Sequence, residues 1–107
     1  DELDGASAVT TVAVEAAVAN GLIVFAPMGN TGPAPTTLGA PADAAGAITL
    51  GAVDLGGQLA GFSSRGPTAD GRIKPDLAFW YDSIRTTAPN SGYTNSFGGT
   101  SAAAPTF

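Results

Sequence analysis

The feature that most constrains this fold is an apolar helical pattern that leads almost directly into an apolar strand pattern. Between positions 6 and 20, apolar residues recur at the three- and four-residue spacing of one helix face. Val14 and Val18 widen that face, so we expect a helix covered on more than one side. Asp4 or Ser7 is the expected cap, and Asn20-Gly21 the expected end. The residues of the expected face are Val9, Val12, Ala13, Ala16 and Ala17.

The run from Leu22 to Ala26 is continuously apolar and lacks the alternation of a half-exposed strand. It predicts a strand buried on both faces, as in parallel sheets. A Gly-, Pro- and Thr-rich loop over 27–46 separates it from a second strand candidate, Ala47–Val53. Helix, strand, loop and strand in this order predict an α/β fold with a parallel sheet. Two further short strands are expected at Leu77–Tyr81 and Ser83–Thr87.

Length and charge limit the classes of function. The chain has 107 residues, enough for one small domain, and shows no internal repeat. Nine acidic against four basic residues give a net charge of −5, which argues against nucleic-acid binding and against an anionic membrane surface. The apolar stretch from Leu22 to Pro27 is too short to span a bilayer, and the acidic start at Asp1 does not fit a signal peptide.

Two residue types are missing from the sequence. Without cysteine there is no disulfide, no thiolate metal site and no cysteine nucleophile. Without histidine, the usual general base at neutral pH is missing. Any serine nucleophile of the triad type would therefore need an imidazole from outside these 107 residues.

Two short glycine-containing segments each allow two interpretations. Gly98-Gly99-Thr100-Ser101 precedes a run of helix formers and is read either as an ordinary helix cap or as a nucleophilic serine whose backbone N–H faces an oxyanion. Met28-Gly29-Asn30 follows the expected buried strand and is read either as a turn or as part of a ligand site, since ligands bind at the carboxyl ends of strands in open α/β sheets.

Taken together and in order, the motifs of this sequence resemble those of the subtilases, the subtilisin-like serine proteases. The resemblance covers nearly the whole chain. The segments that carry it are VAVEAAVANGLIVF (12–25), APMGNTGP (26–33), GAPA (39–42), AITLGAVD (47–54), FSSRGP (62–67), KPDL (74–77) and GTSAAAP (99–105).

The resemblance implies a site and a fold. Ser101 would be the nucleophile, the Asn30 amide would donate to the oxyanion, and Thr100 would line the same hole. The backbone of Ala26, Pro27, Met28 and Gly29 would form one wall of the pocket for the residue before the scissile bond. The implied fold is a partial three-layer α/β fold with a parallel sheet core, lacking the N-terminal strands, so that 1–107 is one incomplete C-terminal segment of the catalytic domain.

The triad aspartate and histidine of the family lie upstream of the position equivalent to Asp1. The resemblance therefore implies a serine endopeptidase fragment that is inactive alone and needs a complementary upstream polypeptide before it acts on peptide or protein substrates. The alternative is a non-catalytic, degenerate or engineered scaffold or binding module. Lys74 is a remote candidate base for Ser101, and Asp76 matches a structural position of the family.

The sequence departs from the family pattern in and after the GTSAAAP segment and after the KPDL segment. Ala102 stands where the family has methionine and Thr106 where it has histidine, and the aromatic run in 79–83 replaces a turn. That run is read as a repacked core, with an exposed patch or an engineered change as alternatives. The helix that begins near Ser101 is expected to span about one turn within the chain.

No metal site is predicted, because the aspartates are scattered among loops without a ligand spacing. The family often binds calcium, so a calcium ion is the one cofactor that the resemblance allows, with no site assigned. By the same resemblance we expect an extracellular location. The aspartates considered are Asp43, Asp54, Asp70 and Asp82.

Overall fold

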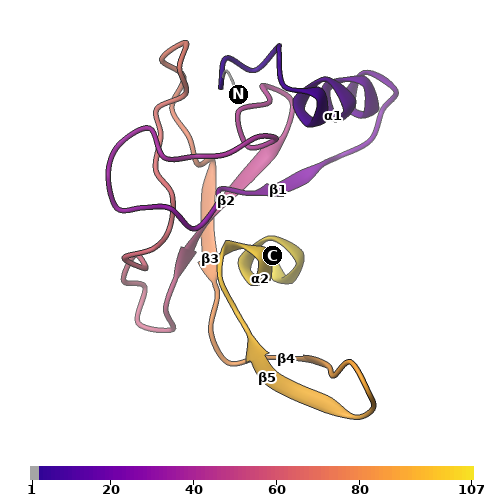
Figure 1. The fold of residues 1–107 in the computed structure, drawn as a ribbon, viewed down its shortest axis with the longest axis vertical. Coiled ribbons are helices and arrows are strands. Elements are labelled where there is room, and N and C mark those ends of the chain that lie inside the picture. Colours follow the sequence, from indigo (N-terminus) through magenta and orange to yellow (C-terminus); the bar gives the residue numbers. More distant parts are fainter. Residues whose placement is uncertain (1–2) are drawn as a thin grey trace.

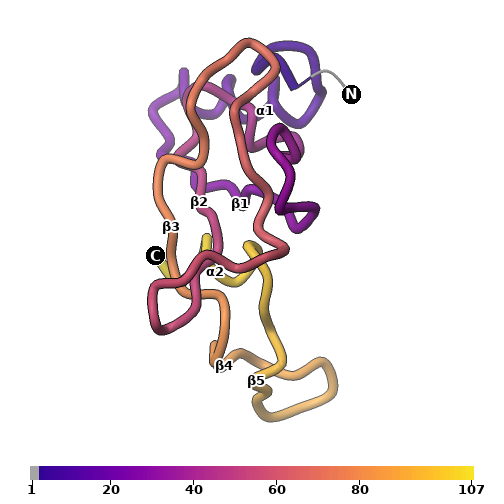
Figure 2. Tube along the Cα trace, turned by 90° about the vertical axis from the view of Figure 1, so that its left-hand side faces the viewer, coloured from indigo at the N-terminus to yellow at the C-terminus, as the bar shows by residue number. Residues whose placement is uncertain are grey.

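A parallel three-stranded sheet forms the centre of the molecule. The computed structural model describes residues 3–107. In chain order, the sheet is formed by β1 (Phe25–Pro27), β2 (Ile48–Val53) and β3 (Leu77–Trp80), with β2 in the middle. Strands β4 (Ile84–Thr87) and β5 (Tyr93–Phe97) form an antiparallel hairpin that projects from the end of the molecule opposite to helix α1 (Figures 1 and 2). The helices are α1 (Val9–Ala19) and α2 (Thr100–Thr106).

The two helices lie on opposite faces of the sheet. Successive side chains of a strand point to opposite faces. In β1, Ala26 packs with Ala44, Ala47 and Val14 of α1, whereas the neighbouring Phe25 contacts Phe107 just beyond α2. Helix α2 packs across all three strands. The order helix, sheet, helix confirms the predicted α/β architecture with a parallel core.

Helix α1 ends as predicted but begins differently. Asn20 is its C-cap and Gly21 follows at φ +89°, the left-handed conformation that glycine supplies at helix ends. Its N-cap is Ala8, without a side-chain cap, so neither Asp4 nor Ser7 caps it. Asp4 Oδ1 instead accepts the backbone N–H groups of Ala6 and Ser7, at 2.8 and 2.9 Å, and so closes a turn ahead of the helix.

The face of α1 that packs agrees only in part with the predicted one: Val14 packs against the buried cluster of Ala26, Ala44 and Ala47, as expected for the widened face. Val9 is 85% exposed and Val12 is 51% exposed, whereas Thr11 is fully buried. The Thr11 hydroxyl donates to Asp43 Oδ1 at 2.6 Å, and Glu15 Oε1 accepts the Gly46 N–H at 3.0 Å. These polar contacts hold the Thr11 side of the helix against the loop that precedes β2. Hydrophobic periodicity misplaced the centre of the packed face, because Thr11 and Glu15 contribute polar contacts beside the apolar contact of Val14.

Strand β1 is shorter and more exposed than the sequence predicts. The strand begins at Phe25, not Leu22, although Val24 O still accepts the Ile48 N–H at 2.9 Å. Leu22 is 59% exposed, Ile23 76% and Phe25 44%. The prediction of a strand buried on both faces is wrong here, because Ala26 is buried on the α1 side while the face that carries Phe25 borders the pocket beside α2. In the sheet, β1 has a neighbour, β2, on one side only. Its other edge is open within the described residues.

The remaining elements agree more closely with expectation. Strands β2, β3 and β4 lie where predicted, and β5 was not predicted because its sequence YTNSF is largely polar. Helix α2 spans seven residues, more than the expected single turn.

The aromatic run in 79–83 is not a repacked core throughout. Trp80 is 47% exposed, so it does not belong to such a core, while Tyr81 packs edge-on against Phe62. No helix among residues 3–107 has the length and apolarity that a membrane span requires.

Candidate functional site

The loop that follows β1 meets the first residues of α2. Met28 continues the strand pairing by donating its N–H to Leu50 O at 3.0 Å, and the chain then turns at Gly29, where φ is +103°. The Gly29 N–H donates to Thr100 Oγ1 at 3.1 Å. Residues about 70 positions apart in the sequence therefore lie together at the carboxyl end of the sheet, where α/β folds place ligand sites.

Hydrogen bonds determine the orientation of the Asn30 side chain. The Thr100 N–H donates to Asn30 Oδ1 at 3.0 Å, and the Thr100 hydroxyl lies 3.2 Å from the same oxygen. A backbone N–H can only donate, so the atom it contacts is the amide oxygen, and the amide nitrogen Nδ2 points away from Thr100. Nδ2 has no partner among the described residues and Asn30 is exposed, so the two N–H donors of this amide are not used within residues 3–107.

The absence of a side chain at Gly99 allows the Asn30 amide to lie close to the start of α2. It has φ +77° and ψ −179°, a conformation that is essentially restricted to glycine. A Cβ atom there would lie 3.1 Å from Asn30 Oδ1 and 3.2 Å from Nδ2, closer than ordinary van der Waals contact. Gly99 therefore permits both the backbone path into α2 and the close approach of the Asn30 amide.

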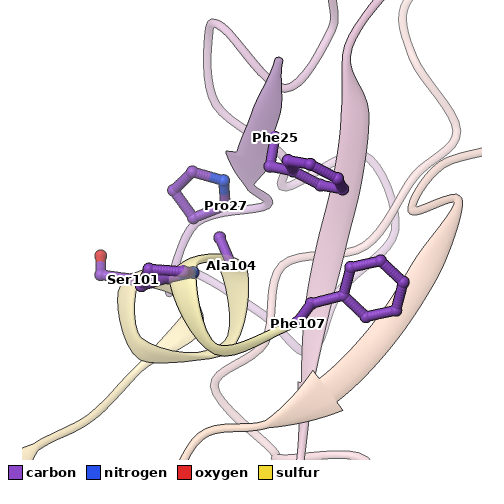
Figure 3. A pocket seen from close by; sticks show the side chains of 6 residues that line it. Phe25, Pro27, Ser101, Ala104 and Phe107 are labelled. Carbon is purple, nitrogen blue, oxygen red and sulfur yellow. The ribbon is translucent and has the colours of Figure 1, made fainter. Parts of the chain in front are cut away.

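Ser101 is the second residue of α2, and its side chain is exposed. Its backbone N–H, one of the orphan donors of a helix N-terminus, has no acceptor among the described residues. Figure 3 shows its hydroxyl oxygen directed away from the rings of Phe25 and Phe107. Ser101 is at the border of a pocket of about 560 Å³ that is otherwise apolar. The other residues that line it are Phe25, Pro27, Ala104, Pro105 and Phe107.

Of the predicted pocket wall, the structure brings one side chain to this pocket. Pro27 lines it, whereas Ala26 and Met28 are buried in the core, with 2% and 0% exposure. Gly29 does not line the pocket, but its backbone N–H donates to Thr100 Oγ1 and so joins the loop after β1 to α2. The predicted residues Asn30, Thr100 and Ser101 thus lie within one short loop-to-helix junction.

The family model described as the subtilase family matches residues 1–106. The chain belongs to the subtilase family. Its sequence is 38% identical over 103 residues to subtilisin from Bacillus pumilus, covering 94% of this chain and 34% of that protein. It is 37% identical over 93 residues to the membrane-bound transcription factor site-1 protease of Mus musculus, covering 81% of this chain and 9% of that protein.

Solved structures agree with this assignment. Sphericase has a TM-score of 0.74 at 28% identity, over 88% of this chain and 34% of that chain. The prenylagaramide maturation protease PagA has a TM-score of 0.73 at 26% identity, over 89% of this chain and 32% of that chain. The chain therefore spans about a third or less of the subtilases that it matches.

Lys74 belongs to a structural cluster of this subtilase. Its ammonium group donates to Ala47 O at 2.8 Å and to Asp76 Oδ2 at 2.7 Å, and only 8% of the residue is exposed. The same carboxylate oxygen accepts the N–H and the hydroxyl of Thr49, both at 2.7 Å. Burial raises the pKa of Asp76, but the hydrogen bonds from Lys74 and Thr49 outweigh it and leave that pKa below its usual value. Lys74 is thus committed to Asp76 and is not paired with Ser101.

Ser64 is a residue of the site region that sequence reasoning missed. It is 1% exposed and contacts both neighbours of Asn30. The only signal in the sequence was its place in the FSSRGP segment, which marked the family without indicating a role.

The aspartates of the described residues do not gather into a cluster of acidic side chains. Among residues 3–107, no three His, Cys, Asp or Glu side chains gather closely enough to hold a metal. Asp43, the most buried of the aspartates, is fully used: its carboxylate accepts the Gly5 N–H at 3.0 Å and the Thr11 hydroxyl at 2.6 Å.

Proposed function

We propose that this chain supplies the nucleophile and the oxyanion hole of a subtilisin-like serine endopeptidase. Ser101 is the nucleophile, and the Asn30 amide and the Ser101 N–H are the oxyanion donors. The observation that carries the proposal is that, among residues 3–107, neither donor has an acceptor and both flank the same junction, while Asn30 Oδ1 is held by Thr100. Preorganised donors of this kind stabilise the charge that develops in acyl transfer.

The chemistry follows from these groups. The Ser101 oxygen attacks the carbonyl carbon of a peptide bond and gives its proton to a base, and the carbonyl π electrons move onto the oxygen. The resulting oxyanion accepts hydrogen bonds from Asn30 Nδ2 and the Ser101 N–H. When the intermediate collapses, the C–N bond breaks, the amine leaves with the proton, and an ester on Ser101 remains for water to hydrolyse.

The base must come from a second segment, because the chain has no histidine. We infer that this complementing segment carries the subtilase aspartate and histidine and that the chain alone is inactive. We propose that the complementing segment docks beside β1 and α2. The open edge of β1 and the apolar pocket beside α2 support this, since an unpaired strand edge is a template for a further strand. The substrate is a peptide or protein.

The cofactor, the class of partner and the location are proposed from the chemistry, the net charge and the family, respectively. The chemistry above is complete without a metal or an organic cofactor, so we propose none for this chain. The acidic net charge of −5 favours neither nucleic acid nor anionic lipid as a partner. An extracellular location is proposed from the family alone.

The test is covalent labelling of Ser101 with a phosphonylating serine-hydrolase probe, read by intact mass. The chain is tested alone and together with a complementing segment, with Ser101→Ala as the matched control. We expect one adduct per chain only in the complemented arm and none for Ser101→Ala.

Two outcomes contradict the proposal. Labelling of the chain alone that depends on Ser101 would overturn the requirement for a second segment. Absence of labelling in both arms would overturn proteolysis and leave a subtilase-derived scaffold or binding module.

A further inference from the structure

We propose that Ser64 is a positioning residue for the oxyanion donor Asn30. The inference rests on the proposed function and deepens it, because it assigns the support of the oxyanion hole to the loop between β2 and β3. Ser64 does not line the apolar pocket beside α2, and its hydrogen bonds among the described residues do not include Ser101.

Ser64 bonds to the residue on each side of Asn30. Its N–H donates to Gly29 O at 3.0 Å, and its Oγ accepts the Thr31 N–H at 3.0 Å. The Thr31 hydroxyl lies 3.1 Å from Ser64 Oγ and donates to Thr37 O at 2.7 Å. Since that hydroxyl has one proton, it accepts from Ser64, so the Ser64 hydroxyl is used both as donor and as acceptor.

Close packing reinforces these bonds. A Cβ on Gly29 would lie 2.9 Å from Ser64 Oγ, and a Cβ on Gly32 would collide with the backbone oxygen of Ser63. Gly32 also donates its N–H to Phe62 O at 2.9 Å. The loop over 29–32 therefore lies directly on the backbone of 62–64, with Asn30 at the point between the two Ser64 contacts.

The consequence for catalysis is geometric. Thr100 orients the Asn30 amide, but the position of the Asn30 Cα depends on the peptide groups on either side, and Ser64 holds both. A donor contributes to an oxyanion hole only when it lies about 2.7–3.1 Å from the oxyanion, so a loosened loop weakens the transition state more than the bound substrate. Loss of Ser64 Oγ should therefore lower kcat and leave KM nearly unchanged.

The experiment compares Ser64→Ala with Ser63→Ala in the complemented enzyme. Both serines are buried, with 1% and 0% exposure, and both lose one hydroxyl acceptor of a backbone N–H. Ser63 Oγ, however, accepts from Ala52 in β2 and does not touch the Asn30 loop. With active sites titrated by the acylation burst, we expect Ser64→Ala to lower kcat about tenfold, as misplacement of a catalytic group does, and Ser63→Ala to leave it within about twofold.

Asn30→Ala provides the decisive comparison. It should lower kcat by about 10²–10³-fold, and adding Ser64→Ala to it should have no further effect, because the misplaced donor is already gone. Equal kcat values for the two serine variants, or a full tenfold loss from Ser64→Ala in the Asn30→Ala background, would overturn the positioning role. A wild-type complex that does not turn over, or an Asn30→Ala variant with unchanged kcat, would instead refute the proposed function itself.

Discussion

At the scale of single residues, the junction is organised by groups whose hydrogen-bonding role is fixed. The Thr100 and Thr31 N–H groups can only donate, so they fix the roles of Asn30 Oδ1 and Ser64 Oγ as acceptors. Two donors of the junction, Asn30 Nδ2 and the Ser101 N–H, have no acceptor in the part of the chain that the structure describes. The site is thus characterised as much by its unengaged donors as by the bonds that hold them in place.

The first prediction concerns Gly99. In Gly99→Ala the new Cβ meets the Asn30 amide at 3.1 Å and the backbone is forced into a conformation that costs about 1–3 kcal/mol. We expect labelling of Ser101 in the complemented enzyme to slow by about tenfold or more, as expected for a displaced catalytic group. Rates are measured by intact mass against time.

Gly57→Ala is the control for Gly99→Ala. Gly57 has nearly the same φ, +78° against +77°, but a Cβ there would meet no atom within 4 Å. This variant should lose stability through backbone strain and keep its labelling rate. Equal slowing of both variants would show that strain, not displacement of Asn30, limits the reaction.

At the scale of elements, the cluster of Lys74, Thr49 and Asp76 joins β2 to the segment that leads into β3. Asp76 Oδ2 accepts three hydrogen bonds, and the Asp76 N–H donates back to Thr49 O at 3.1 Å. The contact replaces part of the strand ladder at the entrance to β3. Its strength depends on the charge of one carboxylate, so the pairing of these strands is expected to be sensitive to acid.

The second prediction gives this acid sensitivity its sign. The pKa of Asp76 is lowered in the folded state, so its contribution to the free energy of unfolding is fully present above the unfolded value of about 3.9 and is lost as pH falls through the folded pKa. Asp76→Asn should be less stable than wild type by about 1 kcal/mol at pH 7, a value reduced by partial exposure of the carboxyl.

Urea unfolding between pH 7 and pH 2 measures this difference. Asn cannot be protonated, so the stability curves of wild type and Asp76→Asn should begin to converge below the unfolded pKa of about 3.9 and meet as pH falls through the lower folded pKa of Asp76. Parallel curves over the whole range would show that the charge of Asp76 does not contribute.

Elements and site differ in how far the sequence predicts them. Strand β2 and the start of α2 follow from local residue patterns, and the motif order located Asn30, Thr100 and Ser101. The burial of Thr11 in α1 could not be predicted, because its hydroxyl is satisfied by Asp43, 32 residues away. The role of Ser64 was hidden for the same reason: its partners Gly29 and Thr31 become neighbours only in the folded chain.

At the scale of the whole molecule, exposed apolar residues gather where β1 ends the sheet. Leu22, Ile23 and Phe25 are exposed along this segment, and Phe107 beside it is 56% exposed and contacts the Phe25 ring. Strand edges without a partner promote association with other chains. A chain with this edge should therefore associate with itself unless a complementing segment covers it.

The third prediction tests this with two isoleucines. Ile23→Lys places a charge beside the open edge of β1, whereas Ile73→Lys places the same charge at an 89% exposed position in the loop before β3. In sedimentation velocity at a fixed concentration, we expect the wild type and Ile73→Lys to form oligomers and Ile23→Lys to remain monomeric, because charged edge residues prevent strand pairing. Ile23→Lys should also need a higher concentration of the complementing segment for half-maximal labelling of Ser101. If both lysine variants associate equally, the open edge of β1 is not the surface through which the chain binds other copies of itself.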